Sequence, residues 1–207
     1  MANIASEEKI AQRRADILEA AIDVFASKGF HAAGIADIAG RLNIGHGTVY
    51  RYYKNKRDIF NAILAGLLEQ MSVVVQQEPP TTNSLEEYRQ QLERIAAHML
   101  RIFNRDSRLV RIAFYEAVSV DGDARNSVEQ FISLFAQFTE HYMKNGMKKG
   151  FLRANMSSVI AANLITAMMM EAVKKAATGN NSEAQIQPWI DEIIQTVIGG
   201  LGVANVG

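Results

Sequence analysis

The residues best suited to chemistry in this sequence form one basic and aromatic cluster near the N-terminus. Every charged residue between Gly40 and Arg57 is positive, although the whole chain balances 22 basic against 22 acidic residues. The cluster consists of Arg41, Tyr50, Arg51, Tyr52, Tyr53, Lys54, Lys56 and Arg57. Cationic groups and tyrosine hydroxyls both bind phosphate oxygens, so the segment is predicted to contact nucleic acid. A basic surface that only faces solvent is the alternative.

No other set of residues has the spacing of a catalytic or metal site. The chain has no cysteine, and its histidines lack the spacing of metal ligands: His31, His46, His98 and His141. The run Asp121-Gly122-Asp123 begins like a calcium loop, but the later oxygen ligands and the closing glutamate are missing. We also find no nucleophile paired with a base and no phosphate-binding glycine loop. The sequence therefore predicts no enzyme activity, no cofactor and no metal.

The basic cluster overlaps a pattern that predicts a helix-turn-helix. Apolar residues at helical spacing indicate short helices near 35–42 and 48–53, preceded by a longer helix from about 7 to 28 that Gly29 would cap. Ala39 is small enough for two helices to cross steeply, and Asn43 tolerates a left-handed turn. The expected shared core is Ile38, Leu42, Ile44, Val49 and Tyr52.

The rest of the chain predicts an all-α protein of about nine helices. Capping patterns at Asn55 and Ser84 start two helices, and Pro79 with Pro80 ends the first of them. No segment alternates long enough to be a strand. The apolar run 156–173 contains too many polar residues for a comfortable membrane span, so we interpret it as a buried helix. We expect a DNA-binding domain over residues 1–55 and a second helical domain over 56–207.

Residues 38–56 resemble the DNA-binding segment of the tetracycline-repressor (TetR) family, and the likeness extends over about residues 10–70. Asn43 stands where the family commonly has glycine, and Gly45 where it commonly has serine or threonine. The resemblance implies that some residues approach base edges: Gly45, His46 and Gly47. It implies phosphate contacts for Thr48, Tyr50, Tyr52 and Lys56, and either role for Arg51. Lys54 is expected at the DNA as part of the same basic cluster.

The resemblance also implies a mechanism. A homodimer in the bacterial cytoplasm would occupy an inverted-repeat operator on double-stranded DNA and leave it when a small apolar or aromatic ligand binds. An absent secretory signal and absent cysteine agree with that location. An activator, a corepressor-dependent regulator, a ligand-binding helical enzyme and an interaction protein without DNA binding remain the alternatives.

Two further groups of residues are expected to bind the ligand and the second subunit. The candidate ligand pocket is Met99, Phe103, Phe114, Glu116, Phe135, Phe138, Met168 and Glu171. Ordinary core packing is the alternative for the apolar members, and a salt bridge for the two glutamates. The candidate dimer interface, on the last two helices, is Leu164, Met168, Trp189, Ile190, Ile193, Ile194 and Val197.

Overall fold

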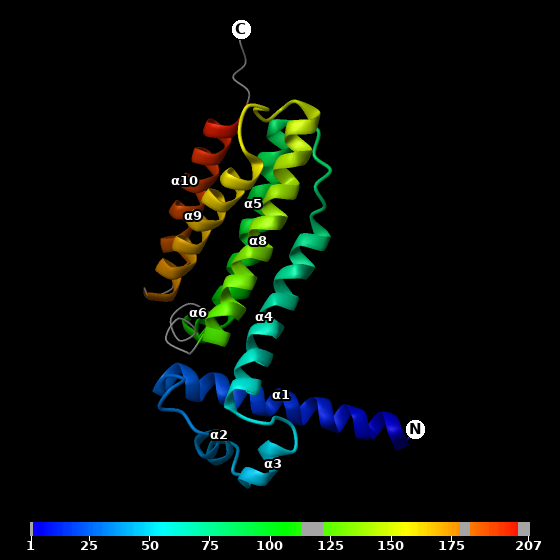
Figure 1. Cartoon of the computed structure of the whole chain (residues 1–207), viewed down its shortest axis with the longest axis vertical. Coiled ribbons are helices and arrows are strands. Elements are labelled where there is room, and N and C mark those ends of the chain that lie inside the picture. Colours follow the sequence, from blue (N-terminus) through cyan, green and yellow to red (C-terminus); the bar gives the residue numbers. More distant parts are fainter. Residues whose placement is uncertain (1, 113–121, 179–182, 203–207) are drawn as a thin grey trace. The chain divides into compact units, whose positions relative to one another are not determined.

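Helices account for all the regular secondary structure in the residues that the computed structural model describes, which are 2–112, 122–178 and 183–202 (Figure 1). The helices are α1 Ala2–Lys28, α2 Ile35–Arg41, α3 His46–Tyr50, α4 Lys56–Gln77, α5 Leu85–Arg105, α6 Ser107–Arg111, α8 Gly122–Lys149, α9 Ser158–Thr178 and α10 Glu183–Leu201. An isolated bridge between Leu152 and Gly202 does not extend into a strand. The all-α prediction is confirmed.

The described residues pack into two units. Unit 1 comprises the described residues of 1–68 and 111–128, and unit 2 those of 69–110 and 129–207. Helix α4 therefore contributes its first part to unit 1 and its last part to unit 2. Packing units are not the same as folding domains, so the division after residue 55 remains a prediction.

Unit 1 is held together by an aromatic core. The Phe30 ring lies 5.4 Å from Phe25 and 5.0 Å from Phe60, measured between centroids. Two turns depend on left-handed backbone, as the sequence predicted: φ is 80° at Gly29 and 53° at Asn43. These turns set the directions in which α1 ends and α3 begins.

Two helices in unit 1 have boundaries that differ from the sequence-based expectation. Helix α1 begins at Ala2, earlier than the expected residue 7. Helix α3 spans His46–Tyr50, although we expected residues 48–53. The shift arises because Gly45, with φ −71° and ψ 146°, already acts as the N-cap. The amide groups of Tyr52 and Tyr53 then bond to the Val49 carbonyl in a turn that follows the helix.

Unit 2 is a bundle of long helices, in which α10 packs on both α9 and α5 (Figure 1). Its first complete helix, α5, begins as the sequence predicted: the Ser84 hydroxyl accepts a hydrogen bond from the Glu87 amide at 3.1 Å. The Glu87 carboxylate in turn accepts from the Asn83 amide at 2.8 Å. These local hydrogen bonds fix the residue at which α5 begins.

Helix α4, in the part of the chain that the structure describes, is long and apolar enough to cross a membrane by length and composition alone. Its regularly spaced apolar side chains are instead buried in the protein: Ile59, Phe60, Ile63, Leu64, Leu67, Met71 and Val74. Burial of one stripe is what a core helix of a globular protein shows.

Candidate nucleic-acid interface and ligand cavity

The first turn of α3 is exposed and open. Gly45, His46 and Gly47 all lie on the surface. A Cβ atom added at Gly45 or Gly47 would meet no atom within 4 Å. The free protein thus has no packing reason for these two glycines. A close approach of backbone to a ligand such as a base edge would supply one.

Helix α3 is fixed from beneath by buried side chains. Val49, Ile38 and Ala39 are fully buried, and the Ala39 carbonyl accepts a hydrogen bond from the Ile44 amide at 3.0 Å. This bond joins α2 to the turn before α3, and the two helices pack in contact, as the small Ala39 side chain at the helix-turn-helix crossing allows.

Tyr53 belongs to the core and not to the surface. Its side chain is buried, and the Arg14 guanidinium lies 5.0 Å from the ring centroid. Arg14 also donates a hydrogen bond to the Tyr52 carbonyl at 3.1 Å. The α1 helix therefore holds the turn that follows α3.

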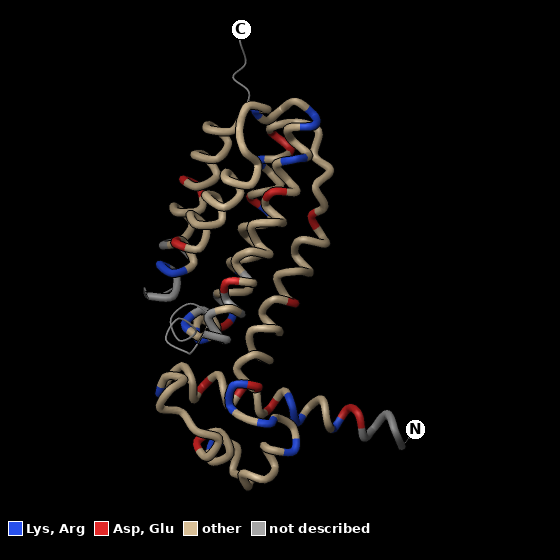
Figure 2. Tube along the Cα trace, viewed as in Figure 1, with Lys and Arg blue, Asp and Glu red and all other residues tan. Residues whose placement is uncertain are grey.

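The cations of the basic cluster have different environments, although Figure 2 shows Lys and Arg gathered in the segment between α3 and α4. Arg41 forms an ion pair with Asp23. Arg51 and Lys54 are exposed, and neither side chain forms a hydrogen bond or ion pair with the described part of the chain. They are therefore the members best placed to bind phosphate.

Lys56 is held inside unit 1. Its ammonium group donates to the carbonyls of Phe30 at 2.7 Å, Ala33 at 2.9 Å and His31 at 3.0 Å. It also lies 4.6 Å from the centroid of the Phe30 ring. An ammonium group has three N–H bonds, and all three are used here. This geometry argues against the expected phosphate contact of Lys56, whereas Thr48, Tyr50 and Tyr52 remain predicted contacts.

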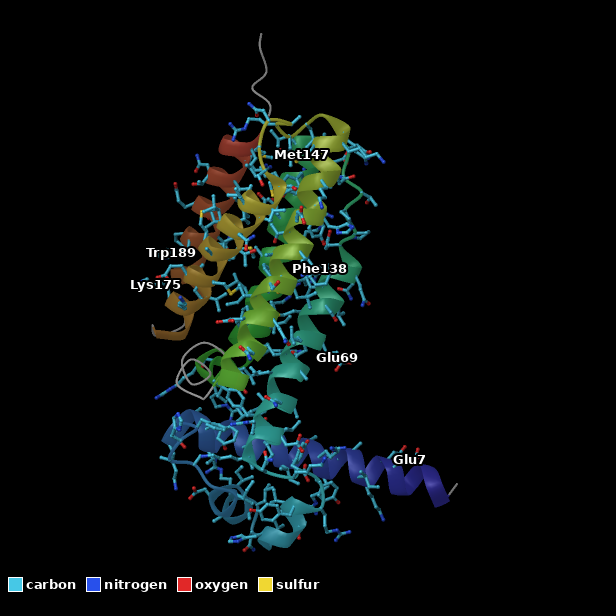
Figure 3. All side chains as sticks on the ribbon, viewed as in Figure 1. Glu7, Glu69, Phe138, Met147, Lys175 and Trp189 are labelled. Carbon is cyan, nitrogen blue, oxygen red and sulfur yellow. The ribbon has the colours of Figure 1, made fainter. Side chains whose placement is uncertain are left out.

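Unit 2 contains an apolar cavity of about 90 Å³ between α5, α8, α9, α10 and the end of α4. It is lined by four of the residues expected in a ligand pocket: Met99, Phe103, Phe135 and Phe138. Figure 3 shows Phe138 on α8. Tyr142, which follows Phe135 and Phe138 on one face of α8, also lines it, as do Tyr88, Ile165 and Met169, which the sequence did not single out. The apolar spacing of α5, from Tyr88 through Leu92, Ile95 and Met99 to Phe103, was a signal that could have identified this wall.

The two tyrosines of the cavity wall stay protonated at neutral pH. Burial raises the pKa of the Tyr142 hydroxyl to about 12, and the nearby Glu78 carboxylate adds to the shift. Burial also raises the pKa of Tyr88, with a smaller contribution from Tyr142. Both hydroxyls can therefore act as hydrogen-bond donors.

Two of the other residues expected in the ligand pocket, Met168 and Glu171, lie outside this cavity. Met168 and Glu171 line a separate open groove between α9 and α10, together with Trp189. The Glu171 carboxylate lies 3.9 Å from the Lys174 ammonium and 3.8 Å from that of Lys175, so the salt-bridge alternative fits. Phe114 and Glu116 lie outside the described residues.

The expected dimer residues divide into two groups. Leu164 and Trp189 are 61% and 42% exposed, and Figure 3 shows Trp189 on the side of α10 away from α8. Ile194 and Val197 are instead buried within the single chain and line the apolar cavity, which Ile190 and Ile193 also border. Their side chains face the bundle because α10 packs on α5 as well as on α9. Ile194 and Val197 therefore leave little surface for a second subunit.

The described residues contain no group of three or more His, Cys, Asp or Glu side chains that could hold a metal ion. Two short helices in contact, α2 and α3, joined by a turn and followed by exposed cations, define a helix-turn-helix transcriptional regulator.

Comparison with known proteins gives the family. Residues 17–63 match the family described as bacterial regulatory proteins, tetR family. The chain is 18% identical over 185 residues to the fatty acid metabolism regulator protein of Bacillus subtilis, which covers 89% of this chain and 93% of that protein. The transcriptional repressor Rv3405c of Mycobacterium tuberculosis is 38% identical over 66 residues, or 32% of this chain and 35% of that protein.

The same fold occurs in the crystal structure of the transcriptional regulator FadR from Bacillus subtilis in complex with stearoyl-CoA. The TM-score is 0.72 at 18% identity, covering 89% of this chain and 97% of that one. The predicted recognition is confirmed by the match over residues 17–63: the chain is a DNA-binding transcriptional regulator whose DNA-binding segment matches the TetR family.

Proposed function

We propose that this regulator is a cytoplasmic repressor that leaves its operator when an apolar ligand enters the cavity of unit 2. The observation that carries the proposal is the cavity itself, since its wall is almost entirely apolar and includes Val75 near the end of α4. A volume of about 10–15 Å³ is enough to hold a water molecule, but a buried water also needs two or more polar partners. The wall of this cavity is almost entirely apolar, so the cavity suits an apolar guest.

A ligand can release DNA only if it prefers a conformation that binds DNA less well. Helix α4 provides a physical connection for such a preference, because its first part packs in unit 1 and its last part in unit 2. A guest that displaces Val75 or Tyr142 would act on the unit 2 part of that helix, since Tyr142 donates a hydrogen bond to the Glu78 carbonyl just after α4.

The names of the relatives support repression as the mode of regulation and a fatty acyl compound as the ligand. One relative is named a repressor, another a fatty acid metabolism regulator, and one structural neighbour holds stearoyl-CoA. We therefore propose a fatty acyl chain as the guest and an inverted repeat near the promoter as the operator.

The protein acts as a homodimer in this proposal. Exposed apolar side chains gather on α9 and α10 in Val159, Ile160, Leu164 and Trp189. A second copy would cover this face with the same residues, as two-fold symmetry requires. The two helix-turn-helix segments of such a dimer would bind two DNA half-sites separated by roughly 34–36 Å or a multiple of that distance.

Fluorescence anisotropy with DNA from the gene's own upstream region tests the proposal. Stearoyl-CoA should weaken operator binding by about 5–150-fold, the usual range of coupling between two sites, and coenzyme A alone should have no effect. If the protein fails to bind the upstream DNA, the proposed operator in that region is contradicted. A ligand that strengthens binding would show a corepressor mechanism instead.

A further inference from the structure

Tyr88 lines the apolar cavity, and its buried hydroxyl has no hydrogen-bond partner among the described residues. Its side chain is fully buried in the first turn of α5, where its amide bonds to the Ser84 carbonyl at 3.0 Å. The ring lines the cavity, and its hydroxyl forms no hydrogen bond with the described residues. A buried hydroxyl normally has a partner, because leaving one unpaired costs free energy.

The other polar groups of the described wall have already used their donors. The Tyr142 hydroxyl donates to the Glu78 carbonyl, and the Thr139 hydroxyl donates to the Phe135 carbonyl at 3.0 Å. Tyr88 thus offers the cavity a donor that these two residues do not. Since Tyr88 stays protonated, it would pair with a hydrogen-bond acceptor.

The cavity also excludes charge. No Lys, Arg, His, Asp or Glu is among its described lining residues. A carboxylate or phosphate inside would lose its hydration without gaining an opposite charge, which is far more costly than burying a neutral ester or ketone. Any charged part of a ligand must therefore remain outside the cavity.

The acceptor would lie at one end of an elongated site. On α5 the lining runs from Tyr88 to Phe103, which at 1.5 Å per residue is about 22 Å along the helix. Beyond Tyr88 the α5 wall is apolar, through Leu92, Met99 and Phe103. This order fits a chain with its acceptor near one end.

We propose that the ligand is an apolar chain with one neutral hydrogen-bond acceptor, such as an ester or thioester carbonyl, and that the Tyr88 hydroxyl binds this acceptor. The proposal rests on the ligand site of the proposed function and specifies its chemistry. Tyr88 is then a residue that determines specificity within the cavity.

The test compares three probes of similar length, namely methyl octanoate, decane and the octanoate ion, by calorimetry on the full-length protein. The wild type should bind methyl octanoate about 5–10-fold more tightly than decane, as expected for one net hydrogen bond. Octanoate should bind more weakly than either. In Tyr88→Phe the preference for the ester should disappear while decane affinity stays the same.

Tyr142→Phe is the matched control, since it removes a hydroxyl from the same wall that already has a partner; it should keep the ester preference. Tyr88→Phe should fold at least as stably as the wild type, because it removes an unpaired polar group. A preference that survives Tyr88→Phe, or an equal loss of ester and decane binding, overturns the proposal. If the wild type binds methyl octanoate and decane equally and both release DNA, the role of Tyr88 is overturned while the proposed function stays intact. If none of the three probes binds, both the role of Tyr88 and the proposed function are contradicted.

Discussion

The Lys56 ammonium lies 4.6 Å from the centroid of the Phe30 ring and donates a 2.7 Å hydrogen bond to the carbonyl of the same residue. Lys56 begins α4, whereas Phe30 follows the end of α1. The contact therefore joins two helices of unit 1 through the loop between α1 and α2. It makes Lys56 a residue that positions the DNA-binding unit.

Lys56→Met should lower the stability of the protein without changing how DNA affinity depends on salt. The substitution keeps an apolar stem but leaves three carbonyls without their donor, at a cost of about 1–3 kcal/mol in the free energy of unfolding. Lys54→Met is the matched control: the melting temperature should stay the same, while the slope of log K against log salt falls by about one. A smaller slope of log K against log salt in the Lys56→Met variant would show that Lys56 does contact phosphate.

Gly47→Ala should separate folding from DNA binding. Gly47 is exposed inside α3 with space around its Cα, so alanine should stabilise the free protein by about 0.5–1 kcal/mol. If this backbone approaches a base edge, the added methyl group should reduce operator affinity. Gly66→Ala in α4, which also has open space, is the control and should leave DNA binding unchanged. Full operator affinity in Gly47→Ala would place the contact elsewhere.

Leu164→Asp should convert the proposed dimer to a monomer that remains folded. Leu164 is 61% exposed in the single chain, so a carboxylate there meets solvent in the monomer but is desolvated near its own copy in the proposed dimer. Ile194→Asp should instead unfold the bundle, because Ile194 is 8% exposed and lines the cavity. Light scattering and circular dichroism distinguish the two effects. A dimeric Leu164 variant with full operator affinity would refute the proposed interface.

The Glu78–Arg94 ion pair should stabilise the protein only above acidic pH. Arg94 donates hydrogen bonds to both carboxylate oxygens, at 2.7 and 2.8 Å, and these bonds lower the pKa of Glu78 although its burial opposes the shift. A carboxyl group whose folded pKa is depressed contributes stability above its unfolded pKa, and this contribution is lost as pH falls through the folded value.

Thermal unfolding of Glu78→Gln tests this dependence. The variant should be less stable than the wild type by about 1 kcal/mol near pH 7, and the difference should shrink below the ordinary glutamate pKa of about 4.3. Glu93→Gln, which removes an exposed partner of Arg89, should change stability little at any pH. A difference that persists at acidic pH would mean that the charge of Glu78 is not responsible.

Sequence by itself determined the features that depend on residues close together in the chain. The helix-turn-helix, the left-handed turns at Gly29 and Asn43, and the Ser84 cap all follow from local backbone preference and spacing. The apolar character of Met99, Phe103, Phe135 and Phe138 was equally visible, and the structure brings these four residues to one cavity.

Tertiary structure decided which partner each side chain meets. Lys56 looked like another cation of the basic cluster, but the carbonyls that bind it lie more than twenty residues earlier in the chain. Ile194 and Trp189 belong to one apolar helix, yet packing on α5 buries the first and leaves the second exposed. Local periodicity gives a helix its apolar face. Whether that face encloses a cavity, as beside Tyr88, or remains open to a second subunit depends on how helices distant in the sequence pack together.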